Sequence, residues 1–135
     1  MTRNMKLELL AFFGVTVGVL LLSGRAFAHH GGAAYETTKS TTLKGTIVEF
    51  KFINPHCQLF IEVKDEKGDT VKWDGEFTNP GALHRRGWTK EMFKPGESVT
   101  LTGNRAKYGA PVMRVTKVEL ADGKTLPALG ADDEN

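Results

Sequence analysis

Residues 79–87, Asn-Pro-Gly-Ala-Leu-His-Arg-Arg-Gly, decide which small β-fold this chain can adopt. Asn79 belongs to the residue types that cap helix N-termini, and Pro80 suits the first helical position. Gly87 suits the left-handed position that follows a helix. The stretch therefore predicts one short helix of about two turns.

Strands are expected on both sides of this helix, because apolar and polar residues alternate there with a period of two. The apolar phase of the first strand changes near Ile47, which predicts a bulge between Gly45 and Val48. The expected strands are residues 41–52, 57–63 and 71–78 before the helix, and residues 98–104 and 112–120 after it.

Three strands, a helix and two strands follow the connectivity of the OB-fold, a five-stranded Greek-key barrel. We therefore predict an all-β domain with one short helix, built as an OB-fold-like barrel over residues 41–127. An SH3-like barrel or a small sandwich is the alternative, and the position of the helix favours the OB-fold. We expect an extended arm at residues 29–40 and a frayed acidic tail at residues 128–135.

The first 28 residues have the order of a secretory signal peptide. Arg3 and Lys6 precede an apolar run of 14 residues, and Ala26-Phe27-Ala28 supplies the small residues of a cleavage site. The run is shorter than the roughly 20 residues of a membrane-spanning helix, although a retained anchor is the alternative. We expect cleavage after Ala28 and a periplasmic protein without a membrane segment.

Loss of this leader makes the protein formally neutral. It removes three of the 18 basic and one of the 16 acidic residues, which leaves 15 of each sign. A neutral domain has no overall electrostatic attraction to nucleic acid or to an anionic membrane, so we expect neither as a partner. The remaining 107 residues suffice for one domain.

Cys57 is the only cysteine, so the chain cannot form an internal disulfide. It alternates in phase with Leu59, Ile61 and Val63, which favours a packed, unreactive thiol on the inner face of a strand. A metal-binding or redox-active thiol is the alternative. The sequence holds no nucleophile, phosphate loop or carboxylate pair with supporting context, so we expect no enzyme.

The motifs Asn54-Pro55-His56, Trp73-x-x-Glu76-Phe77 and Gly87-Trp88 occur together with a Pro-Gly-x-x-Val-Thr-Leu-Thr-Gly strand that begins at Pro95. In this combination, from about His29 to Leu126, the chain resembles a family of small exported bacterial proteins classed as a domain of unknown function. The family often has a tryptophan two residues before its Asn-Pro-His, where this chain has Phe52 followed by Ile53. The resemblance implies export and a small β-barrel, and it brings no established activity.

Cleavage after Ala28 would give His29 a free amine, whose nitrogen and ring nitrogen can chelate one metal ion. A further imidazole, from His56 or His84, would complete a three-nitrogen site suited to Cu(II). We therefore predict a metal site with His29, His56 and His84 as candidate ligands and copper as the expected ion. The alternative is a disordered arm, because Gly31 and Gly32 follow directly.

A metal-free function is the second hypothesis. OB-folds bind ligands through the face of strands two and three and the adjoining loops, so an unknown periplasmic partner or small ligand would bind there. The candidate contacts are Asn54, Gln58, Arg86 and Trp88, with Trp88 alternatively sealing the end of the barrel.

Soft donors offer another possible copper site. Met92, Met113 and Trp73 could join His56 around Cu(I), but their spacing lacks a compact Met-x-Met pair. We expect the two methionines to fill the core instead.

Overall fold

The computed structural model describes residues 34–128, which belong to a compact unit at residues 31–135. The predicted leader, the arm residues before Ala34 with His29, and the tail after Ala128 lie outside the described residues. The described part contains six strands and one helix. They are β1 (Tyr35–Lys51), β2 (Gln58–Lys64), β3 (Thr70–Glu76), α2 (Pro80–Arg85), β4 (Ser98–Ala106), β5 (Val112–Leu120) and β6 (Thr125–Pro127).

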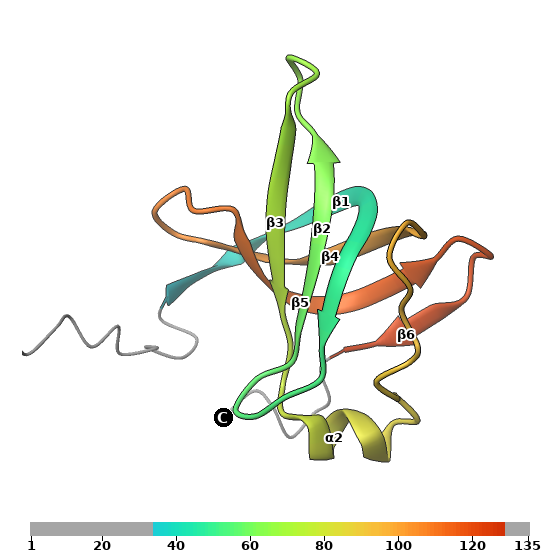
Figure 1. Ribbon diagram of the computed structural model, residues 1–135. Helices are drawn as coiled ribbons and strands as arrows, with labels where there is room; N and C mark the ends of the chain where they lie inside the picture. Colours follow the sequence, from blue (N-terminus) through green and yellow to red (C-terminus); the bar gives the residue numbers. More distant parts are fainter. Residues whose placement is uncertain (1–33, 129–135) are drawn as a thin grey trace, which may run out of the picture. The chain divides into compact units, whose positions relative to one another are not determined.

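Five strands close into a barrel, and β6 extends the sheet beyond β5 (Figure 1). Neighbouring strands are antiparallel in the order β3-β2-β1-β4-β5-β6, and a parallel pairing of β3 with β5 closes the barrel. The long β1 pairs with β4 through its first part and with β2 through its last part. This is the OB-fold-like connectivity that the sequence predicts.

A bulge lets β1 bend around the barrel. Ile47 pairs with Ile61 and Glu49 pairs with Phe60, so Val48 is an extra residue in β1. The bulge lies where the change of apolar phase predicts it.

The start of β1 differs from the prediction, because the strand begins at Tyr35 and not at Thr41. Pairing of Tyr35 with Ala106 in β4 makes this segment a strand. Residues 36–40 are all exposed, so they show no apolar alternation from which a strand could be predicted.

The helix α2 has the predicted boundaries. The Asn79 side chain accepts a hydrogen bond from the backbone N–H of Ala82 at 2.9 Å, and Pro80 occupies the first turn. Gly87 has a φ of 85°, the left-handed conformation that ends the helix. Leu83 is fully buried, so α2 packs against the barrel core through one face and lies across one end of the barrel (Figure 1).

Apolar side chains from every barrel strand fill the interior. Leu59, Ile61, Leu101 and Val115 are completely buried, and full burial of such a side chain contributes about 1.5–3 kcal/mol. Near α2 the core consists of an aromatic cluster with ring centroids 4.8–6.5 Å apart. The aromatic cluster comprises Phe50, Phe77, Trp88 and Phe93.

Candidate functional site

The outer face of β1, β2, β3 and β5 carries a row of polar side chains. Strand register places Lys51 beside Gln58, Gln58 beside Glu76, and Glu76 beside Arg114. Residues that pair across neighbouring strands project from the same face of a sheet, so these four residues form one row across the barrel. We call Lys51, Gln58, Glu76 and Arg114 the polar row.

The β1–β2 loop places His56 at the end of this row. The Cys57 N–H donates to the Thr78 carbonyl at 3.0 Å, and the Phe77 N–H donates to the Cys57 carbonyl at 2.9 Å. These bonds continue the β2–β3 ladder one step beyond the strand ends. They hold the backbone next to His56 against the backbone next to Glu76, so the two side chains meet on the outer face.

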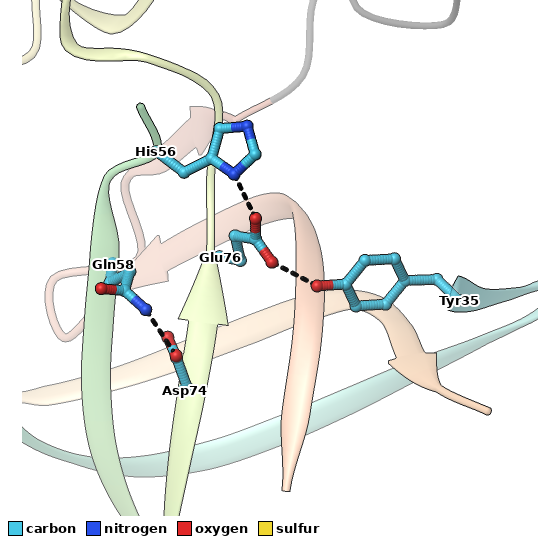
Figure 2. A network of polar contacts seen from close by, with 5 residues as sticks. All are labelled: Tyr35, His56, Gln58, Asp74 and Glu76. Carbon is cyan, nitrogen blue, oxygen red and sulfur yellow. Dashed lines mark hydrogen bonds and ion pairs between the residues drawn. The ribbon is translucent and has the colours of Figure 1, made fainter. Parts of the chain in front are cut away.

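Glu76 joins two side chains from distant parts of the chain (Figure 2). One carboxylate oxygen, Oε1, contacts Nδ1 of His56, and the other, Oε2, accepts a hydrogen bond from the Tyr35 hydroxyl. The His56 side chain is 46% exposed and the Glu76 side chain only 16%. A sheltered carboxylate therefore holds a histidine whose ring extends towards solvent.

The Tyr35 hydroxyl keeps its proton across the neutral pH range. Burial raises the pKa of the Tyr35 phenol, and the hydrogen bond to Glu76 with the negative charges of Glu76 and Asp74 raises it further. The positive charge of Arg114 has the opposite effect. Tyr35 therefore acts as a hydrogen-bond donor to Glu76.

A second polar pair lies beside the first. Nε2 of Gln58 donates to Oδ2 of Asp74 at 2.7 Å (Figure 2), and the Asp74 N–H donates to the Pro111 carbonyl at 2.9 Å. Oδ1 of Asp74 is buried and has no hydrogen-bond partner within residues 34–128. Burial raises the pKa of this carboxyl group, the Gln58 hydrogen bond lowers it, and the charge of Glu76 raises it. Asp74 and Gln58 thus form a partly desolvated pair on the face where the sequence predicts ligand binding.

The three candidate metal ligands have different places in the structure. His29 lies outside the described residues, and His56 lies at the end of the polar row. His84 is exposed in the last turn of α2, where a basic side chain is favoured by the helix dipole. Within residues 34–128 no group of three or more His, Cys, Asp and Glu side chains could hold a metal ion.

The four residues predicted to contact a ligand also lie in different parts of the structure. Asn54 is exposed in the β1–β2 loop and Gln58 lies in the polar row. Arg86 donates a hydrogen bond to the Ala128 carbonyl at 3.3 Å, near the end of α2. Trp88 is 1% exposed within the aromatic cluster, so it seals the end of the barrel and presents no ring to a surface ligand.

The cysteine and the soft donors lie in the core or next to it. Cys57 is completely buried, and this burial raises the pKa of its thiol, which keeps the sulfur protonated. Met113 is fully buried, and Met92 packs against the core with partial exposure. The guanidinium of Arg105 lies 4.5 Å from the Trp73 ring centre and covers it.

Sequence reasoning missed the residues that organise this site. Asp74 and Glu76 have the alternation of a solvent-facing strand, which explains them without a special role, and Tyr35 falls in the segment predicted as an arm. The Trp73-x-x-Glu76-Phe77 motif of the family resemblance is the signal that could have singled out Glu76. The partner of Glu76 lies 41 residues away in Tyr35, beyond the range of local pattern analysis.

Comparisons with known proteins give a family without an assigned activity. Residues 17–113 match the model of a family described as "Family of unknown function (DUF6152)". A search of curated proteins finds none that matches the chain significantly. Among the described residues, no helix has the length and hydropathy needed to cross a membrane.

Proposed function

We propose that this chain, which belongs to the Family of unknown function (DUF6152), is a periplasmic binding module for a transition-metal ion. Copper is the expected ion. In this proposal the leader is removed after Ala28, and the new N-terminus of His29 binds the metal together with His56. The role is binding without a reaction step, and neither nucleic acid nor a membrane is a partner.

The proposal rests on the observation that Tyr35 and His56 share the Glu76 carboxylate. Tyr35 follows His29 by six residues, and six residues of extended chain span at most about 20 Å. The start of β1 is thus held next to His56 at a distance that the intervening chain can cover. In this proposal the residues between His29 and Tyr35 bring the His29 amine to the His56 imidazole.

The donor set favours copper. The amine and ring nitrogens of His29 would supply two nitrogen ligands and His56 a third, and imidazole with square-planar nitrogen geometry suits Cu(II). A carboxylate on the second ring nitrogen is the usual companion of a metal-bound histidine, and Glu76 stands in that position on His56.

A metal-free interaction module is the second candidate, and exposed apolar side chains favour it. Ile53 in the β1–β2 loop is 53% exposed, and Tyr108 in the β4–β5 loop is 95% exposed. The β4–β5 loop is tied to the site through the bond from Lys107 N–H to the Ala34 carbonyl. In this second proposal a periplasmic partner or small ligand contacts these loops and the Gln58–Asp74 pair.

The deciding experiment uses the chain exported with its own leader and recovered from the periplasm. Intact mass identifies the first residue, and titration with Cu(II) against a competing chelator measures affinity. We expect one copper per chain and a large loss of affinity in His56→Ala. The exposed His84→Ala variant is the matched control and should bind as the unaltered protein does.

Two results would contradict the metal proposal. A chain with one extra residue before His29 should lose the amine chelate, so equal affinity in that chain would exclude it. A retained leader in the periplasmic protein would remove the amine altogether. If copper fails to bind and Ile53→Ser with Tyr108→Ser abolishes recovery of a partner, the interaction module is the better account.

A further inference from the structure

The first half of β1 has a strand neighbour on only one side within residues 34–128. There β1 pairs with β4 through residues 40–46, whereas its pairing with β2 begins only at Thr46 and continues to Lys51. In Figure 1 the start of β1 and the β2–β3 hairpin leave the barrel in different directions. We call the side of residues 36–45 that faces away from β4 the open edge.

Backbone hydrogen bonds show which groups of β1 point to the open edge. The Ile47 N–H donates to the Glu97 carbonyl at 2.9 Å, so the backbone groups of Ile47 face the side of β4. In an antiparallel ladder the N–H and C=O groups of successive residues alternate between the two sides of a strand. Those of Ser40, Thr42 and Lys44 therefore point to the open edge. Such a row of unpaired groups can pair with a further strand.

The residues of the open edge favour pairing with a further strand. Residues 36–44 contain four threonines and no proline, and β-branched residues such as threonine are enriched in strands. Residues 36–40 are all exposed, and residues 36–39 have no register partner on β4. A further strand would therefore give these residues the partners that β4 does not provide.

We infer that the open edge pairs with the same edge of a second copy of this chain, antiparallel and about a two-fold axis at Ser40. In this register Glu36 of each copy lies opposite Lys44 of the other. Thr38 of each copy lies opposite Thr42 of the other. Opposite charges and threonine pairs in directly opposed positions stabilise a sheet, and a two-fold dimer requires a patch that is complementary to itself.

Charge also favours this register over its neighbours. An axis at Lys39 would place that lysine opposite its own copy, and like charges in such positions are destabilising. An axis at Thr41 would leave Glu36 and Lys44 without an opposite charge. With the axis at Ser40, both charges are paired and Lys39 lies opposite Thr41.

Pairing through one strand edge predicts a weak dimer, because the contact buries little surface. Stable specific interfaces bury about 1,200–2,000 Å², and smaller contacts belong to transient complexes. We therefore expect reversible self-association that is measurable at protein concentrations up to about 1 mM. The inference rests on strand register and charge, and it is independent of the proposed metal site.

Amide hydrogen exchange measured by NMR tests the inference most directly, with protein expressed from the full chain at low and at high concentration. We expect the N–H groups of Ser40, Thr42 and Lys44 to be protected only at high concentration. The N–H groups of Thr41 and Leu43 face β4 and should be protected at both concentrations, so they are internal controls. Sedimentation velocity over the same range should show a monomer becoming a dimer.

A proline at Thr42 tests the backbone pairing. Thr42→Pro removes an N–H that points to the open edge and no bond to β4, and edge strands tolerate proline at such positions. Each dimer loses two of these donors, so we expect the dissociation constant to rise about 10–100-fold. Thr42→Ala keeps the N–H and is the matched control, with an expected change of at most about threefold. If Thr42→Pro fails to fold, charge variants provide the test.

An exchange of charges tests the register. Glu36→Lys and Lys44→Glu each set like charges opposite each other twice in the dimer, so each should weaken it about tenfold. The double variant restores opposite charges and should dimerise within about threefold of the unaltered protein. Lys67→Glu, at an exposed position in the β2–β3 turn, is the control for the change in net charge.

Three results would overturn the inference. A monomer at every concentration, with unprotected N–H groups along the open edge, excludes self-association. Protection of these groups that does not depend on concentration means that another part of the chain covers the edge. A dimer that neither Thr42→Pro nor the charge variants weaken forms through a different surface. None of these results bears on copper binding, so the proposed function is tested separately.

Discussion

Replacement of Gly103 by alanine tests how closely β4 and β5 approach each other in the barrel wall. A Cβ atom at this position would lie 2.1 Å from the Arg114 carbonyl oxygen and 2.9 Å from the Cα of Val115. An ordinary carbon–oxygen contact is about 3.3 Å, so the strands must separate by about 1 Å. Because the obstacle is backbone, no side-chain rotation can relieve it.

The expected cost lies at the upper end of the range for overpacked interiors, about 3 kcal/mol in free energy of unfolding. For a domain of this size that corresponds to a fall in Tm of about 12–24 °C. Displacement of β5 would also move Arg114 away from its register partner Glu76, which would disturb the polar row. Urea denaturation followed by far-UV circular dichroism measures the loss of stability.

Gly109→Ala is the matched control for a purely conformational effect. Gly109 has a φ of 77°, and within residues 34–128 no atom beyond its two chain neighbours lies within 4 Å of the place that an alanine methyl group would occupy. Alanine there therefore costs only the backbone strain of about 1–2 kcal/mol. Gly103→Ala should be clearly less stable than Gly109→Ala. If Gly103→Ala unfolds within about 0.5 kcal/mol of the unaltered protein, the close approach of β4 and β5 is refuted.

Three further predictions concern the helix cap and the site. Asn79→Ala removes the acceptor for the Ala82 N–H and should cost about 1 kcal/mol in urea denaturation, and an unchanged midpoint would refute the cap. The raised pKa of Asp74 means that stability falls as pH rises from about 4 through the pKa of the folded carboxyl group. The stability of Asp74→Asn relative to the unaltered protein should therefore increase over that range, and a constant difference would contradict the burial of the carboxyl group. Because the pKa of Tyr35 is raised, the contribution of its hydroxyl to the free energy of unfolding is complete below about pH 10 and declines at higher pH. Above that pH the free energy of unfolding of Tyr35→Phe should therefore fall less steeply than that of the unaltered protein.

Local patterns in the sequence predict much of this fold. The capping residues of α2, the bulge at Val48 and all of β5 depend on neighbouring residues, and the structure confirms them. Burial of Cys57 follows from strand alternation and is confirmed too. These features need no knowledge of which strands pair.

Features that depend on distant pairing could not be predicted in this way. The first residues of β1 and the short β6 owe their strand conformation to β4 and β5, because their own side chains lack a clear alternation. Glu76 is the clearest case, since an exposed-face glutamate becomes a shared acceptor only when the barrel brings Tyr35 and His56 to it. Pattern analysis therefore predicts His56 as a candidate and misses the carboxylate that contacts it.

Pulsed electron paramagnetic resonance of the exported protein with one Cu(II) per chain would test the metal assignment at the level of individual donor atoms. With the histidines labelled in nitrogen-15, we predict couplings from one terminal amine and two imidazoles. The His56→Ala variant should show one imidazole coupling fewer. A spectrum identical in the two proteins, or one without an amine ligand, would contradict the assignment.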